Sequence, residues 1–182
     1  MPYAIELFLD ERADRRVRQM WAALDAAGVM SLGGRPGTDH HPHVTLSVFQ
    51  EGDPDQVADV LRPVLATTAG LPLQLAGLGF FLTDEAVAFL AVIPSGRLLT
   101  LHRQVHEAVA PIAEGIWPYY RPDALLPHCT LATGVTDRAT VADVVAGLPI
   151  PIPALASAAY LVEVPGGHSR TALTPITGIN PR

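Results

Sequence analysis

Seven segments of the chain alternate apolar and polar residues or form short apolar runs, and these are the patterns that predict β-strands. Residues 3–9 alternate at first and then become apolar. A longer run over residues 71–82 contains Gly77 and Gly79, which predict a bulge in that strand. The remaining predicted strands are residues 44–49, 86–93, 129–133, 154–164 and 171–176.

Helices are predicted between these strands. Residues 11–29 carry Val17, Met20, Trp21 and Leu24 at helical spacing, with Asp10 in front as an N-cap. A second helix opens with Asp53-Pro54, a cap followed by a proline at the first helical position. The strands and helices together predict an α+β fold. The predicted helices are residues 11–29, 53–68, 96–113 and 137–147.

The order strand, helix, strand, helix, strand occurs twice along the chain. His43 follows Leu9, the end of the first strand, by 34 residues, and His128 follows Ile93 by 35. We therefore expect one domain over residues 1–182, built as two lobes related by a pseudo-two-fold axis. Each lobe would be a largely antiparallel sheet flanked by helices, with a central cleft. The repeat units would be residues 3–82 and 86–164, followed by a C-terminal strand over 170–177.

Composition narrows the class of protein. The chain has 182 residues, of which 49% are hydrophobic and 16% charged, enough to bury the core of one domain. The stretch 144–162 has no charge, but prolines and a glycine interrupt it, so we do not expect a membrane helix. No leader peptide is evident, and Cys129 is the single cysteine, so the expected location is the cytoplasm.

The charge pattern excludes several functions. A formal net charge of −6 leaves few cations for a long nucleic-acid duplex, although a small nucleotide or an RNA end needs only a local basic pocket. All 12 basic residues are arginine. The absence of lysine excludes a covalent nucleotidyl-lysine, a Schiff base and the lysine of a phosphate-binding P-loop.

The candidate catalytic residues lie in a repeated motif. Pro42-His43-x-Thr45-Leu46 recurs as Pro127-His128-x-Thr130-Leu131. A random order of the same residues would contain about 0.006 copies of this pattern, so two copies are not an accident of composition.

Residues two apart on a strand share a face, so the side chains of His43 and Thr45 should point to the same side of the strand. The residues that alternate with them should point to the core. The same alternation places His128 and Thr130 on one face and Cys129 on the other. Two imidazoles across a cleft can take and deliver protons, and two hydroxyls can bind the oxygens of a phosphodiester.

The duplicated motif resembles that of the two-histidine (2H) phosphoesterase superfamily, which includes 2′-5′ RNA ligase-like proteins and cyclic nucleotide phosphodiesterases. The resemblance implies a bilobal α+β fold and metal-independent chemistry, without a cofactor, on 2′,3′-cyclic or 2′-5′ phosphodiesters. His43 and His128 would be the acid–base pair, and Thr45 and Thr130 the phosphate anchors. The resemblance does not tell which histidine is the acid.

Other residues are candidates for substrate contacts, and two other functions stay open. Trp117, Tyr119 and Tyr120 precede the second motif and could stack on a base. His40 and His41 are expected at the mouth of the cleft, and His102 and His106 on an exposed helix face. We expect a monomer. The tentative substrate-binding residues are Arg35, Tyr120, Arg121, His168 and Arg170.

The first alternative is a module of the same fold that binds a nucleotide or RNA end without turnover. The second is a metallohydrolase built on Asp39, His41 and His43, since histidine and aspartate both bind metals.

Overall fold

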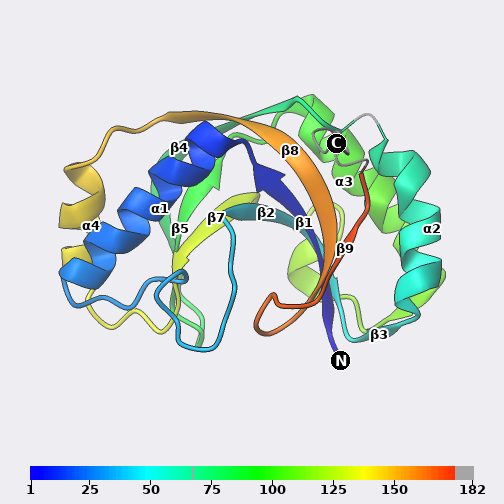
Figure 1. Ribbon diagram of the computed structural model, residues 1–182, viewed down its shortest axis with the longest axis horizontal. Coiled ribbons are helices and arrows are strands. Elements are labelled where there is room, and N and C mark those ends of the chain that lie inside the picture. Colours follow the sequence, from blue (N-terminus) through cyan, green and yellow to red (C-terminus); the bar gives the residue numbers. More distant parts are fainter. Residues whose placement is uncertain (67, 175–182) are drawn as a thin grey trace, which may run out of the picture.

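The computed structural model describes residues 1–66 and 68–174 and places one antiparallel sheet at the centre of the molecule (Figure 1). Its main path runs β2-β1-β8-β4-β5-β7, and β9 pairs with β8 at the side. The predicted α+β class is confirmed. The strands of this sheet are β1 (Tyr3–Leu9), β2 (His43–Phe49), β4 (Leu71–Phe81), β5 (Val87–Val92), β7 (His128–Ala132), β8 (Ile152–Glu163) and β9 (Arg170–Ala172).

Each described α-helix begins at a capping side chain. Asp10 accepts hydrogen bonds from two backbone N–H groups of the first turn of α1, and Asp53 does the same for α2, with Pro54 at the first position. Ser95 and Asp137 cap the other two helices. The described helices are α1 (Glu11–Ala26), α2 (Pro54–Leu65), α3 (Gly96–Val109) and α4 (Arg138–Ala146), with a short 3₁₀ helix, η1 (Pro118–Tyr120).

Several predicted boundaries were too long. The first helix stops at Ala26 because Gly28 takes a left-handed φ of 81°, a conformation that ends helices. The third helix stops at Val109, since a helix rarely includes the residue before a proline, here Pro111. Ala113–Glu114 instead forms strand β6, which pairs with β3 (Glu51–Gly52). The described part of the C-terminal strand is β9, and residues 175–177 lie outside the described residues.

The two halves of the chain are interleaved in space. β1 and β5 are the first strands of the halves, β2 and β7 the second, and β4 and β8 the third. The sheet order then reads the same from either end, with the two third strands exchanged at its centre. The helices also pair between the two halves, because α2 packs against α3 and α1 packs against α4 (Figure 1). A duplicated unit that exchanges its third strand would give this order.

The sheet curves so that its two end strands approach each other. In Figure 1 it forms an arch, with helices at both sides and β2 and β7 beneath β8. The thiol of Cys129 on β7 lies close to the backbone of His43 on β2. The indole N–H of Trp21 on α1 donates to the carbonyl oxygen of Thr130, 3.2 Å away. These contacts bring the two strands that carry the repeated motif to the centre of the molecule.

Among the described residues, no helix has both the length and the apolar character needed to cross a membrane.

Candidate active site

The first motif occupies the start of β2, on the inner face of the arch. His43 is 9% exposed, and its Nδ1 lies 2.6 Å from the carbonyl oxygen of His41. A carbonyl can only accept a hydrogen bond, so Nδ1 carries a proton and donates it. The local bond fixes the tautomer and leaves Nε2 as the atom that can exchange a proton with a ligand.

The second motif repeats this geometry at the start of β7. The Nδ1 of His128 lies 2.7 Å from the carbonyl oxygen of Leu126, again two residues earlier in the chain. His128 packs against Phe81 and Phe89, with ring centroids at 4.9 and 5.2 Å. Burial lowers the pKa of His128 below its ordinary value of 6.5, and the nearby charge of His43 lowers it further.

Burial alternates along the second motif strand, β7, as predicted, whereas every residue of β2 is buried. Val44, Leu46 and Leu131 are fully buried in the core, and Cys129 is 1% exposed. Burial raises the pKa of the Cys129 thiol to about 12, so this thiol stays protonated at neutral pH. Cys129 is therefore a core residue of the motif strand.

Tyr120 connects the first motif to the loop before the second. Its hydroxyl lies beside Thr45, and burial raises the pKa of Tyr120 to about 12. Nε2 of His102 on α3 lies 2.8 Å from the Tyr120 carbonyl oxygen. The expected exposure of His102 was wrong, because the residue is 2% exposed. Its place beside Leu98, Leu101 and Val105 on the apolar stripe of the helix was the available signal.

A pocket of about 210 Å³ lies beside the second motif. His128 and Thr130 form one part of its wall, and the η1 segment contributes aromatic rings. Its other walls are largely apolar, which suits the flat face of a base or another uncharged ring. The remaining lining residues are Phe81, Thr83, Glu85, Val87, Trp117, Tyr119, Tyr120, Ala124, Leu125, Leu126 and Thr133.

Glu6 is a site residue that the sequence analysis missed. It lies on β1, is only 6% exposed, and places Oε1 3.4 Å from Nε2 of His43. Burial raises the pKa of this carboxyl, and the charges of His43 and Arg170 offset part of that rise. The signal was present in the sequence, since Glu6 is the only charged residue of the strand at residues 3–9.

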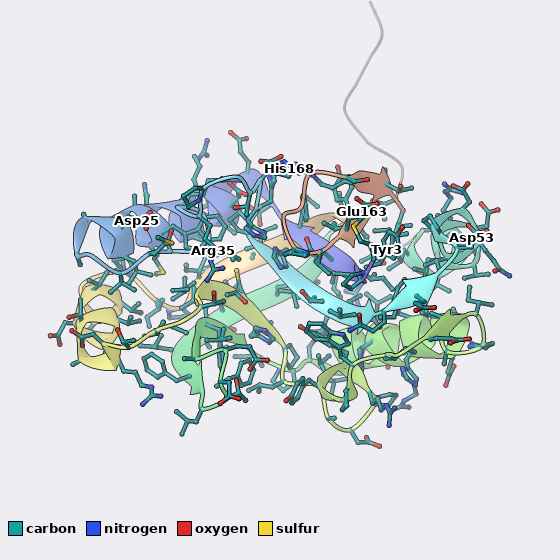
Figure 2. The ribbon with its side chains drawn as sticks, turned by 90° about the horizontal axis from the view of Figure 1, so that it is seen from below. Tyr3, Asp25, Arg35, Asp53, Glu163 and His168 are labelled. Carbon is teal, nitrogen blue, oxygen red and sulfur yellow. The ribbon has the colours of Figure 1, made fainter. Side chains whose placement is uncertain are left out.

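Three tentative substrate-binding residues lie around the loop of residues 31–41. Arg35 is hydrogen-bonded to the carbonyl and hydroxyl of Thr133, and its Nε is buried without a partner among the described residues. Arg170 forms an ion pair with Asp39. Nε2 of His168 lies 2.9 Å from the Gly37 carbonyl oxygen. Figure 2 shows Arg35 in the segment between α1 and β2 and His168 in the segment between β8 and β9.

Arg121 is not brought to the motifs. Its side chain is exposed, and it lines a separate hollow with His106 and Ile116. His40 and His41 lie in the loop that leads to β2, as predicted. The pKa of His40 is lowered to about 4, first by burial and then by the charges of His43 and Arg35.

The residues of the proposed metal site have other partners. Asp39 pairs with Arg170, and His41 stacks on Phe8 with ring centroids at 5.0 Å. Within residues 1–66 and 68–174, no three or more His, Cys, Asp or Glu side chains are grouped so that they could hold a metal ion.

Comparisons with known proteins place this fold. No curated protein matches the chain. Among solved structures, TT0787 of Thermus thermophilus is similar, with a TM-score of 0.61, 18% identity and 95% coverage of both chains. E. coli LigT complexed with 3′-AMP gives a TM-score of 0.59 and 15% identity over 94% of this chain and 95% of that one. A phosphoesterase structure gives 0.57 and 18% over 94% and 97%.

The comparison with protein families is more specific than these structural likenesses. The model of the 2′-5′ RNA ligase superfamily matches residues 9–168, which include both copies of the repeated motif. The chain therefore belongs to the 2′-5′ RNA ligase superfamily.

Proposed function

We propose that the protein is a metal-independent phosphoesterase that acts on 2′,3′-cyclic or 2′-5′ phosphodiesters of small nucleotides or RNA ends. The observation that supports this most directly is the matched pair of imidazoles. Each histidine donates its Nδ1 proton to the carbonyl two residues earlier, so each keeps Nε2 for proton transfer. Family membership supports chemistry on phosphodiester bonds.

The proposed reaction needs one proton acceptor and one proton donor. One histidine takes a proton from water or a ribose hydroxyl, whose oxygen then forms a bond to phosphorus. The other gives a proton to the oxygen that leaves as the old P–O bond breaks. Thr45 and Thr130 donate hydrogen bonds to the non-bridging oxygens, whose charge rises in the transition state.

The cleft also offers groups for the rest of the substrate. The apolar pocket beside His128 suits a nucleobase, and E. coli LigT has been crystallised with 3′-AMP. Arg35, His168 and Arg170 lie around the 31–41 loop and would contact phosphate oxygens. Tyr120, whose hydroxyl lies beside Thr45, would help to orient that side chain. Arg121 is left out of this proposal because it lines a different hollow.

The test is turnover of 2′,3′-cyclic nucleotides and 2′-5′-linked dinucleotides by the purified protein in EDTA. His43→Ala and His128→Ala should each lower kcat by about 10²- to 10⁴-fold, the usual contribution of one acid or base. His106→Ala is a matched control, because that histidine lines the hollow of Arg121 and lies outside both motifs. Its kcat should stay unchanged.

Two results would contradict the proposal. Loss of activity in EDTA would disprove the metal-independent mechanism. Tight binding of nucleotides without turnover of any substrate in the panel would instead favour a binding module of the same fold.

A further inference from the structure

The two motifs differ at one matched position of the neighbouring strands. On β1, Glu6 lies opposite Thr45, and on β5, Phe89 lies opposite Thr130. Both strand pairs also shift register at the same place, between Ile5 and Glu6 and between Ala88 and Phe89. Such irregularities re-aim side chains, and they are frequent beside active sites. The duplicated architecture therefore presents one acidic and one aromatic side chain to equivalent histidines.

The contacts of these two side chains are different in kind. The Glu6 carboxylate lies 3.4 Å from Nε2 of His43, the nitrogen that the backbone contact leaves available. The Phe89 ring lies 5.2 Å from the His128 ring, between centroids, and offers no acceptor for a proton. No described carboxylate forms an ion pair with His128. The two histidines of the site therefore differ in whether a carboxylate lies beside them.

The contact between Glu6 and His43 determines how many protons the first motif holds. Nδ1 of His43 already donates to a carbonyl, so a favourable contact between Nε2 and the carboxylate requires one proton between them. That proton can sit on the nitrogen, which gives an ion pair, or on the oxygen, which gives a neutral pair. Either state holds one more proton than an unpaired neutral imidazole such as His128.

We propose that Glu6 is a positioning residue of the site, which holds a proton on the first motif and makes His43 the proton donor and His128 the proton acceptor. This inference rests on the proposed function. In the opening of a cyclic phosphodiester, His128 takes a proton from water, whose oxygen bonds to phosphorus. The Glu6–His43 pair gives its proton to the ribose oxygen that leaves. Exchange with solvent then removes the proton from His128 and returns one to the Glu6–His43 pair.

The surroundings of Glu6 contain other titratable groups, among them Tyr160, which lies opposite Glu6 on β8. His43 on β2 and Arg170 on β9 favour its charged form, whereas burial opposes it. Tyr120 on η1 and Cys129 on β7 also lie close enough to interact with its charge. Both have pKa values of about 12, so neither titrates near neutral pH. His43 is therefore the partner of Glu6 that can exchange a proton there.

The experiment compares Glu6→Gln, Glu6→Asp and the control Glu163→Gln. Glu163 lies on β8 opposite Tyr3 (Figure 2), whereas Glu6 lies opposite Tyr160. Glu163→Gln therefore removes a carboxylate from the same sheet at a position that is not paired with Glu6. Glu6→Gln should lower kcat about ten- to a hundredfold, with KM changed less than about threefold, because Glu6 acts through His43. Glu6→Asp should recover part of the loss, and Glu163→Gln should match the unmodified protein.

The pH profile separates this role from a merely structural one. Activity that needs a donated proton falls as pH rises, so loss of the carboxylate should move this basic limb to lower pH by about one unit. The acidic limb, which reports the acceptor, should stay in place. A uniform loss of kcat with unmoved limbs would overturn the proposal.

Nitrogen NMR of the histidine rings tests the same point without turnover, so it distinguishes this inference from a failure of the proposed function. In the unmodified protein at neutral pH, the Nε2 signal of His43 should report a proton held between this nitrogen and the Glu6 carboxylate. In Glu6→Gln at the same pH, this signal should be lost. A His43 ring spectrum that is identical in the two proteins would show that Glu6 holds no proton there.

Discussion

At the scale of single residues, the site depends on how the chain fixes two imidazoles. The bonds from Nδ1 to the carbonyls of His41 and Leu126 are local, so the repeated motif and its preceding loop determine them together. The sequence therefore identified His43, Thr45, His128 and Thr130 as candidates. The lone charge of Glu6 on a predicted strand was a signal, but its contact with His43 could not be predicted, because that contact depends on the register of β1 against β2.

The pH dependence of the reaction is a prediction at this scale. Burial lowers the pKa of His128 below its ordinary value of 6.5, so its protonation is displaced toward more acidic solution. As the proposed proton acceptor it must be neutral, and kcat/KM should therefore fall as pH drops, with a midpoint below 6.5. The full profile should be bell-shaped, since the site also needs a donor.

The variant Phe81→Ala tests whether the burial of His128 sets the acidic limb of the pH profile. Removal of the ring that packs on His128 admits water and weakens the effect of burial. The acidic limb should then move up toward pH 6.5, as measured in the kcat/KM profile. An acidic limb that stays in place in Phe81→Ala would mean that another group controls it.

At the scale of elements, the caps and periodicities that predicted the strands and helices agree with the structure. Asp10 illustrates what the sequence could not predict. It caps α1, but it also accepts a hydrogen bond from the backbone N–H of Leu155, 145 residues away. Periodicity reports which face of an element is buried, and it carries no information about the distant strand that this element meets.

This double role leads to a prediction about stability. Asp53 caps α2 only, whereas Asp10 caps α1 and also binds β8. Asp53→Ala should lower the free energy of unfolding by about 1 kcal/mol, the usual value for an N-cap. Asp10→Ala should cost about 1 kcal/mol more, because it also removes the partner of Leu155. Urea unfolding measures both, and equal losses would contradict the double role.

At the scale of the whole molecule, the strand order determines how the two halves depend on each other. Both neighbours of β4, which are β5 and β8, belong to the second half of the chain. β8 in turn pairs with β1 and β4 of the first half. The sequence showed that the element order repeats, but two separate lobes and two interleaved halves would show the same repeat. The exchange of the third strands became evident only from the pairing.

Interleaving predicts that neither half folds alone. A fragment of residues 1–84 would retain only the β1–β2 pair, and two-stranded sheets are marginally stable in water. Its α1 and α2 would also lose their helical neighbours, α4 and α3. We expect residues 1–84 and residues 85–182 to show no cooperative thermal transition by circular dichroism when each is alone. Mixed together, they should regain one transition, because the exchanged strands restore the central pairing. A sharp transition in either fragment alone would mean that its own strands suffice, and that the exchange at the centre of the sheet adds little to stability.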